Sequence, residues 1–135
     1  MRLQYTTDCA LRMMVYVAGE NRIVSSRELE EKIGFPQQCI FSAGRKLKKA
    51  GYINTISGPF GGYILSRSPK EITIQDILVV FKDSLSVCCE KAPVKRSNTT
   101  AMNNYVKMTE KLEADIRKRL SECTLAHLLH KNINF

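Results

Sequence analysis

The stretch from Gly51 to Leu65 constrains the fold of this chain more than any other part of its 135 residues. It reads GYINTISGPFGGYIL, in which two short runs of β-branched and aromatic residues flank a loop of serine, glycine, proline and phenylalanine. Strands joined by such a loop are typical of a β-hairpin. We therefore expect a strand over residues 52–56, a loop over 57–62 and a return strand over 63–65.

Two helices are predicted ahead of this hairpin. The first covers residues 5–18, where apolar residues recur at helical spacing, and Thr7 or Asp8 is its expected cap. The second begins at Ser25, because Glu28 three residues later completes the form of a capping box. A glycine ends this second helix, so a tight turn follows it.

A third helix is predicted from Pro36 to Ala50, with Gly51 as its left-handed stop. Its inner face consists of apolar residues at three- and four-residue steps: Ile40, Ala43, Leu47 and Ala50. Its outer face is mostly polar and basic: Gln37, Gln38, Phe41, Ser42, Arg45, Lys48 and Lys49. A short helix, a tight turn, a second helix and then a hairpin form a winged helix-turn-helix. The sequence therefore predicts a mainly α fold with a small β wing, and DNA binding is the first hypothesis.

The balance of charges supports this hypothesis. The chain has a net charge of +8, and most of the excess falls within residues 1–70, which also contain the helix-turn-helix pattern. A basic surface attracts nucleic acid through its phosphates, whereas a contribution to solubility alone is the alternative. No apolar run approaches the length of a membrane span, so we expect a cytoplasmic protein without a membrane partner.

The remainder of the chain is predicted to form a linker and a long helix. Thr73 and Asp76 indicate one more short helix, which completes a DNA-binding domain over residues 1–81. Residues 82–99, rich in Lys, Ser and Pro, are interpreted as a linker or sensor loop. Residues 100–135 then supply a dimerisation helix and a C-terminal tail.

The long helix, from Ala101 to about Leu120, carries one apolar stripe: Met102, Tyr105, Leu112, Ile116 and Leu120. Such a stripe on an otherwise charged helix needs a partner surface. The helix could pack on its own domain. Pairing with its equivalent in a second subunit is favoured, because helix-turn-helix proteins bind two half-sites as twofold dimers. A short terminal helix over residues 121–129 is expected to close that contact.

The predicted DNA contacts fall on three segments. They are Ser26 and Arg27 of the second helix; Gln37, Gln38, Cys39, Phe41, Ser42, Arg45 and Lys48 of the third; and Ser57, Gly58, Phe60 and Gly61 of the wing. Glutamines can pair with adenine and an aromatic ring can contact thymine methyl groups, whereas cations further along the helix suit phosphates. Phe60 has no evident core to enter. A wing that lies against phosphates or enters the minor groove explains this residue, and a ring folded back onto the hairpin is the alternative.

Three segments, taken in order, resemble a known family. They are MRLQYTTDCALRMMVYVA, SSRELEEKIGFPQQCIFSAGRKLKKAGYI and SGPFGGYILSRSPKEITIQDIL. With the C-terminal CTLAHLL, they are similar to the Rrf2 family of bacterial winged-helix transcription regulators, the opening segment being closest to its nitrite-sensitive repressor branch. The resemblance implies a homodimeric repressor on a palindromic operator, with the third helix in the major groove and the wing in the minor groove. Ser57 stands where many members carry a basic residue, which implies a different operator preference.

The resemblance also implies a sensor, because members of this family often hold an iron–sulfur cluster through three cysteines before the long helix. Cys88 or Cys89 falls near the first position, and Asp8 matches an acidic ligand position. No cysteine or histidine occurs from Glu90 to Glu122, so the other two ligands are missing. We expect no cofactor and no metal site, with a cluster at the two cysteines and a cross-subunit Asp8 as the alternative.

Thiol chemistry without a metal is a further hypothesis. Cys88 or Cys89 would then sense oxidants or nitric oxide, and oxidation of Cys39 would alter the third helix directly. A regulator that responds to a small ligand, or one without cysteine chemistry, stays open as an alternative. Cys9 and Cys123 are interpreted as small core residues.

Two other classes of function stay open. A winged-helix module that docks a protein co-regulator and has no operator would contain the same elements, and an atypical iron–sulfur protein would bind iron. Enzymatic activity is not expected, because no P-loop, Ser-His-Asp arrangement or carboxylate pair is evident. His127 and His130 are interpreted as solvated or interface residues rather than a metal pair.

Overall fold

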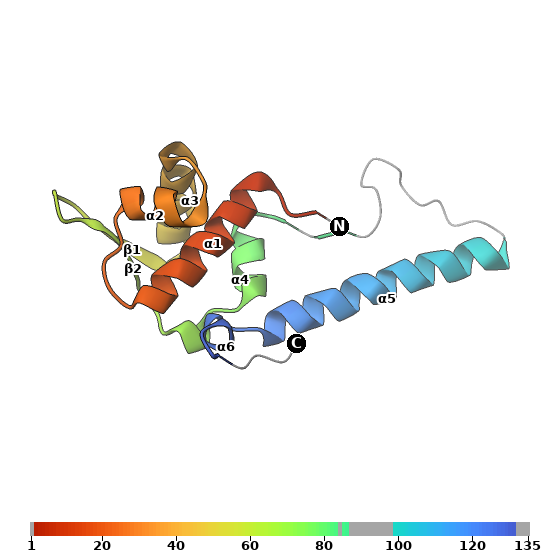
Figure 1. Cartoon of the computed structure of the whole chain (residues 1–135). Helices are drawn as coiled ribbons and strands as arrows, with labels where there is room; N and C mark the ends of the chain where they lie inside the picture. The colour runs from red at the N-terminus through yellow and green to blue at the C-terminus, as the bar shows by residue number, and fades with distance from the viewer. Residues whose placement is uncertain (1, 84, 87–98, 132–135) are drawn as a thin grey trace.

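The computed structural model describes residues 2–83, 85–86 and 99–131 (Figure 1). In chain order its elements are α1 (Tyr5–Glu20), α2 (Ser26–Ile33), α3 (Gln37–Lys49), β1 (Ile53–Ile56), β2 (Gly62–Leu65), the 3₁₀ helix η1 (Pro69–Glu71), α4 (Ile74–Val80), α5 (Thr100–Glu122) and α6 (Leu125–Leu128). The predicted fold class, mainly helical with a two-stranded wing and a long C-terminal helix, is confirmed. None of the described helices is both long and apolar enough to cross a membrane.

Local interactions explain where α2 begins and where α3 ends. The Ser25 hydroxyl accepts a hydrogen bond from the N–H of Glu28 at 3.1 Å and caps α2, as predicted. Only this half of the capping box forms, because the Glu28 carboxylate instead accepts from Tyr16 at 2.7 Å and Arg22 at 2.8 Å. Gly51, with φ of 85°, provides the left-handed stop after α3.

Two predictions about the helices are wrong. Gln4 occupies the N-cap of α1 and makes no side-chain cap, so Thr7 and Asp8 lie inside the helix. Ala50, predicted on the inner face of α3, is exposed because α3 ends one residue before it, whereas Gly44 is buried.

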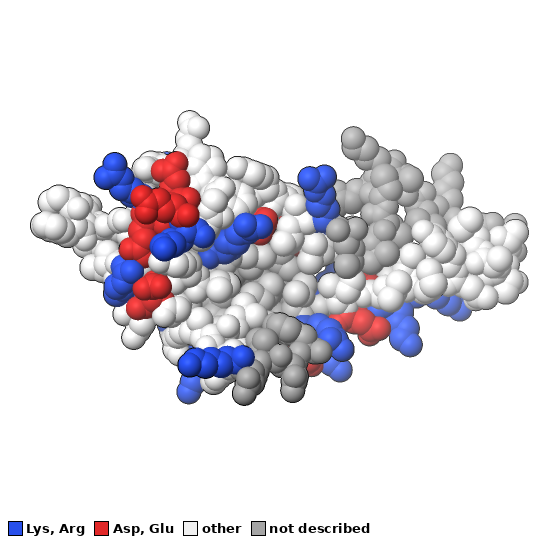
Figure 2. Space-filling view, viewed as in Figure 1, with Lys and Arg blue, Asp and Glu red and all other residues white. Residues whose placement is uncertain are grey.

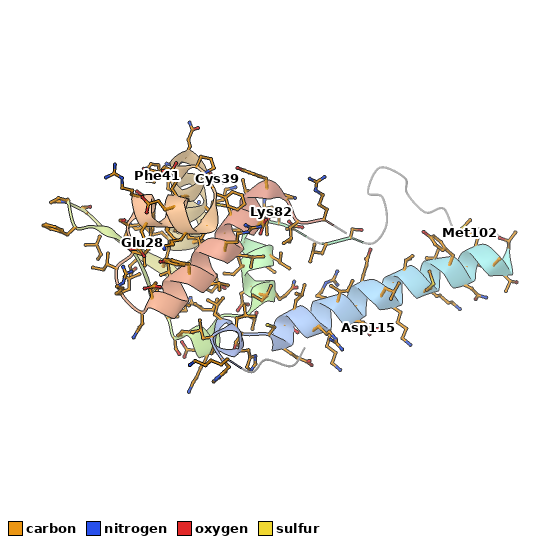
Figure 3. All side chains as sticks on the ribbon, viewed as in Figure 1. Glu28, Cys39, Phe41, Lys82, Met102 and Asp115 are labelled. Carbon is orange, nitrogen blue, oxygen red and sulfur yellow. The ribbon has the colours of Figure 1, made fainter. Side chains whose placement is uncertain are left out.

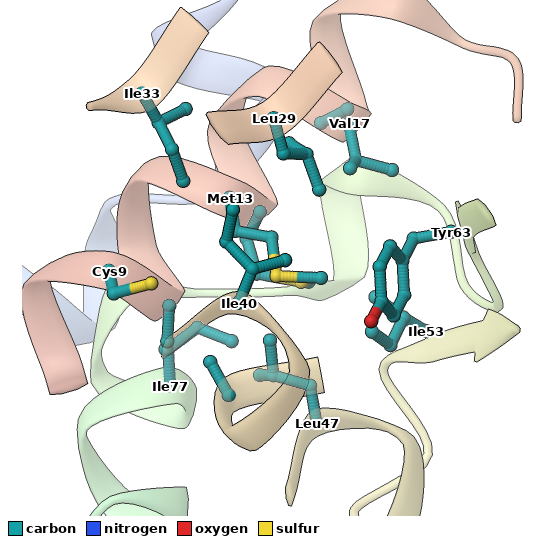
Figure 4. Close-up of a cluster of buried hydrophobic side chains, with 14 of the residues drawn as sticks. Cys9, Met13, Val17, Leu29, Ile33, Ile40, Leu47, Ile53, Tyr63 and Ile77 are labelled. Atoms are coloured by element: carbon teal, nitrogen blue, oxygen red, sulfur yellow. The ribbon is translucent and has the colours of Figure 1, made fainter. Parts of the chain in front are cut away.

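One hydrophobic core joins the four helices of the winged domain to the hairpin (Figure 4). Its larger members come from every element around it: Met13, Met14, Val17, Leu29, Ile33, Ile40, Leu47, Ile53, Tyr63, Ile77 and Leu125. Cys9 is fully buried in this core, as predicted, and Cys123 is half-buried. The helix-turn-helix and the wing therefore share a single packed interior.

The wing is anchored by more than its own two strands. β1 and β2 pair antiparallel, with Ile56 opposite Gly62 at the end nearest the loop. Val24 forms an additional bridge with Tyr63, in which each N–H donates to the other residue's carbonyl at 2.8 Å. A lone valine ahead of a helix has no strand pattern, so the sequence did not predict this bridge. It joins the residues before α2 to the wing.

The C-terminal tail does not lie where the sequence placed it. The terminal helix begins at Leu125, not Ser121, which still belongs to α5. Leu125 is fully buried, its N–H donates to the carbonyl of Ile72 at 2.8 Å, and Thr124 bridges Thr73. In this chain α6 therefore closes the core of its own domain, where it packs on η1 and α1.

The long helix α5 extends away from this core on the side opposite the wing (Figure 1). Its most exposed large apolar side chains are Met102, Tyr105, Met108 and Leu112, each 43% to 51% exposed. Ile116 and Leu120 are half-buried near the end of α5 that approaches α4. Packing on the chain's own domain therefore accounts for only the C-terminal part of the predicted stripe. Met108 belongs to the same surface and was not predicted.

Candidate nucleic-acid interface

A groove lies between the start of α2, the outer face of α3 and the wing. Its lining residues come from all three segments: Ser25, Ser26, Arg27, Phe41, Thr55, Ile56, Gly58, Pro59, Gly61, Gly62 and Tyr63. Among them are five residues predicted to contact DNA, namely Ser26, Arg27, Phe41, Gly58 and Gly61. The fold thus brings parts of all three predicted DNA-contacting segments onto one surface.

The outer side of α3 continues this surface. Gln38, Arg45 and Lys48 are exposed, and Ser42 is half-buried. Phe41 is 41% exposed at the groove and is labelled in Figure 3. Gln37 is engaged within the protein, because its Nε2 donates to a carboxylate oxygen of Glu30 at 2.8 Å. Gln38 is therefore the more exposed of the two amides on α3.

Cys39, labelled in Figure 3, is less exposed than Gln38 and Phe41 on the same helix. It is half-buried and packs against the hydrophobic core, which includes Cys9. Burial, reinforced by Cys39, raises the pKa of the Cys9 thiol above its ordinary value. Cys39 thus supports α3 from the core side, and a direct base contact does not follow from its position.

Close packing connects the wing to α3. The Tyr63 ring occupies the space that a side chain at Gly44 would need, since a Cβ there would lie 2.7 Å from Cε1 of Tyr63. Burial raises the pKa of the Tyr63 hydroxyl. Lys48 Nζ donates to Thr55 Oγ1 at 2.9 Å, which adds a polar link between α3 and β1. The wing and α3 therefore form one packed unit.

Sequence reasoning missed several residues of this groove: Ser25, Thr55, Ile56, Pro59, Gly62 and Tyr63. Alternation along a strand would not have found Thr55 and Ile56 together, because adjacent residues of a strand point to opposite faces and yet both line the groove. No local signal could have paired Tyr63 with Gly44, because the two lie on different elements. Position 62 requires glycine, because a Cβ there would collide with the carbonyl of Val24.

Charges around the groove are mixed on the helices and absent from the wing. The exposed cations of this region are Arg27, Arg45, Lys48 and Lys49. Figure 2 shows an acidic cluster with basic side chains beside it. Arg22 pairs with Glu20 at 3.0 Å and with Glu28 at 2.8 Å. The segment from Ile53 to Ser66 contains no charged residue. Attraction of an anion therefore depends on the helices.

The predicted sensor residues are not assembled into a site by the described part of the chain. Asp8 pairs with Arg12 within α1 at 3.0 Å. Cys88 and Cys89 lie outside the described residues. Within the described ranges, no group of three or more His, Cys, Asp or Glu side chains could hold a metal ion. Because the sequence between residues 40 and 122 contains only these two adjacent cysteines, its donors do not fit a three-thiolate cluster.

The helix-turn-helix and wing geometry agrees with comparisons to known proteins. A model of the Rrf2 family, described as an iron-dependent transcriptional regulator, matches residues 3–131. This chain belongs to the Rrf2 family. BadM of Rhodopseudomonas palustris is 25% identical over 130 residues, which cover 96% of this chain and 83% of BadM. The regulator NsrR of Bacillus subtilis is 25% identical over 89 residues, or 64% of this chain and 61% of NsrR.

Solved structures of other regulators share the fold of this Rrf2 chain. CymR, the global cysteine regulator of B. subtilis, superposes with a TM-score of 0.77 at 18% identity, covering 96% of each chain. IscR of T. potens superposes with a TM-score of 0.73 at 23% identity, covering 96% of this chain and 86% of that one. Membership of this family makes the chain a helix-turn-helix transcriptional regulator rather than an enzyme, and implies that it binds DNA.

Proposed function

We propose that this Rrf2-family regulator is a homodimeric repressor that binds a palindromic operator through α3 and the wing. The observation that supports this most directly is the groove in which α2, α3 and the wing meet. In a twofold dimer the two grooves would face half-sites about 34–36 Å apart, or a multiple of that spacing.

The proposed roles follow from where each side chain lies. Gln38 and Phe41 face the base edges of the major groove, where an amide can pair with adenine and a ring can contact a thymine methyl group. Arg27 and Arg45 contact phosphates, because they are exposed and flank these two residues, and Lys48 joins them when its ammonium group leaves Thr55. Phosphate contacts supply affinity and register, while the two central residues supply sequence preference.

The exposed apolar face of α5 supports the dimer. Tyr105, Met108 and Leu112 lie on successive turns and leave a continuous apolar surface on the part of the helix that extends from the body. Pairing with the same face of a second copy would remove this surface from water. The twofold axis of such a pair matches the symmetry of a palindromic operator.

The test is selection of bound sites from random DNA with the full chain, followed by affinity measurements over a range of salt concentrations. We expect inverted repeats and a strong salt dependence. Arg45→Ala should weaken binding about equally for all sequences and make the salt slope shallower by about 1, whereas Gln38→Ala should relax preference at one position. Lys107→Ala, an exposed cation on α5, is the matched control.

Repression is tested separately by placing the selected operator over a promoter in a transcription assay. Addition of the protein should lower transcript yield, and scrambling one half-site should restore it.

If the protein bound DNA without sequence preference or salt dependence, the chain would instead fit the protein-interaction module that the sequence left open.

We propose oxidation of Cys39 as the signal, because this thiol is half-buried on α3, whereas burial raises the pKa of the Cys9 thiol and so lowers its reactivity. Treatment with hydrogen peroxide should weaken operator binding in the parent protein and in Cys123→Ser. Cys39→Ser should be insensitive. If Cys39→Ser responded to peroxide as the parent does, while Cys88→Ser or Cys89→Ser lost the response, the sensing thiol would be Cys88 or Cys89 instead of Cys39.

A further inference from the structure

The tip of the wing carries the most exposed large apolar side chain among the described residues. Phe60 is 92% exposed, which is about twice the exposure of Ile56 at the end of β1. Figure 1 shows the hairpin projecting away from the helices, so that its tip stands clear of the body. A ring in this position adds nothing to the core.

The turn itself holds the ring outward. The N–H of Gly61 donates to the carbonyl of Gly58 at 3.0 Å, so Pro59 and Phe60 occupy the central positions of a β-turn. A side chain at Gly61 would collide with the carbonyl of Ile56, which shows how tightly the loop is closed. The alternative in which Phe60 folds back onto the hairpin is therefore wrong.

The base of the wing is fixed relative to α3. Tyr63 is hydrogen-bonded to Val24 on one side and packs against Gly44 of α3. Lys48 adds its hydrogen bond to Thr55. A hairpin held at its base in this way presents its tip at a set position relative to α3.

The tip of the wing offers an apolar ring and no cation. No charged residue lies between Ile53 and Ser66, so the wing lacks the cations that hold a nucleic-acid backbone. Ile53 and Tyr63 of the two strands are buried, and Gly62 lies against the carbonyl of Val24, so the part of the hairpin that stands clear of the body is the loop over residues 57–61. An apolar ring at the tip of this loop meets no other part of the described chain that would keep it from entering a groove.

We propose that Phe60 is a wedge that enters the minor groove of double-stranded DNA and inserts between two stacked base pairs. The inference rests on the proposed operator binding and adds a bend and a sequence preference to it. Insertion of apolar wedges kinks a duplex toward the major groove by about 20–90°. Pyrimidine–purine steps unstack most readily, so the operator should carry one where the wing lies.

The first experiment measures the bend and the unstacking directly. The selected operator is labelled with a donor and an acceptor dye at its ends, and in a second series 2-aminopurine replaces one adenine at a time. Binding of the full chain should shorten the end-to-end distance. It should also raise 2-aminopurine fluorescence at one step in each half-site, because that base loses its stacking partner.

The second experiment compares variants on the same DNA. Phe60→Ala should abolish both signals and weaken operator binding about tenfold, the loss expected when one stacking contact is removed. Phe60→Leu should keep part of both signals, since leucine also serves as a wedge. Val79→Ala is the matched control, because Val79 is 63% exposed on α4 and does not line the groove.

A third measurement separates the wedge from the rest of the interface. Replacing the unstacked step by part of a stiff A-tract should cost the parent protein affinity and leave Phe60→Ala almost unaffected. If the parent bound its operator without a bend, or if Phe60→Ala kept the parent's bend and affinity, the wedge would be excluded while operator binding stood. If no operator could be selected at all, the proposed function itself would fail.

Discussion

The body of the molecule and the exposed part of α5 use similar side chains in opposite ways. In the body, the aliphatic side chains of α1 to α4 and α6 meet in one core, and many of them are fully buried. On α5, Tyr105, Met108 and Leu112 are 43% to 51% exposed. The body is therefore complete within one chain, whereas the apolar face of α5 has no partner within the described part of the chain. This difference supports the proposal that the body binds DNA and that α5 joins two copies of the chain.

The largest effect should come from breaking the core where the tail enters it. Leu125→Ala removes a fully buried side chain and leaves a cavity beside Ile72, which should lower the free energy of unfolding by about 2–5 kcal/mol. Chemical denaturation measures the loss. Leu129→Ala, at a 41% exposed position in the same tail, should cost less than about 1 kcal/mol. Equal losses in the two variants would show that α6 does not close the core.

A charge on the apolar face of α5 should act on association and leave the fold intact. Leu112→Glu places a carboxylate in the proposed subunit contact, so the dimer should weaken at least about a hundredfold, while the circular dichroism of the monomer stays unchanged. Sedimentation measures the dimer. Ala114→Glu is the matched control, because Ala114 is exposed on the opposite side of the helix. A Leu112→Glu protein that stayed dimeric would place the contact elsewhere.

Replacing either of two glycines of the body by alanine should change the free energy of unfolding, but in opposite directions. Gly44→Ala pushes against the Tyr63 ring at 2.7 Å and should lower stability by about 1–3 kcal/mol and loosen the wing. Gly19→Ala meets Leu129 at an ordinary 3.5 Å and should raise stability by up to about 1 kcal/mol, because alanine favours the helix. Denaturation and operator affinity are the two readouts. Stabilisation by Gly44→Ala would contradict the close contact between α3 and the wing.

The smallest effect should be a pH dependence of stability that comes from a hydrogen bond at the surface of the body. The Tyr16 hydroxyl donates to Glu28, and this bond raises the pKa of Tyr16 from 10 to about 12. Because the folded pKa exceeds the unfolded one, the contribution is fully present below pH 10 and is lost as the pH rises through 12. The stability difference between the parent and Tyr16→Phe should therefore shrink over that range. Glu28→Gln should show the same flattened profile, and an unchanged profile in both variants would exclude the pair.

Much of the fold could be predicted because its signals are local. Ser25 before a short amphipathic helix, and two β-branched runs around a glycine loop, specify a helix start and a hairpin over a few residues each. The order of these elements then indicated the winged helix-turn-helix. Missed contacts, such as Val24 with Tyr63, join residues from separate elements and leave no trace in any short window of sequence.

The candidate site was predictable in outline only. Periodicity placed Phe41 and Arg45 on the outer face of α3, and composition placed Phe60 at a loop tip. Neither pattern shows that Gln37 is held by Glu30 or that Cys39 packs against the hydrophobic core. Periodicity assigns residues to a face of a helix, whereas such partners depend on how the helices pack.

By itself, the sequence determined the class of fold, the family and the uncharged wing with an aromatic residue in its loop, because each depends on residues near one another or on motifs in order. Only the tertiary structure decided that α6 belongs to the body, that α5 leaves an apolar face exposed, and that the Phe60 ring points into solvent. These outcomes depend on contacts between distant segments and on space already occupied by other side chains, and a linear pattern records neither.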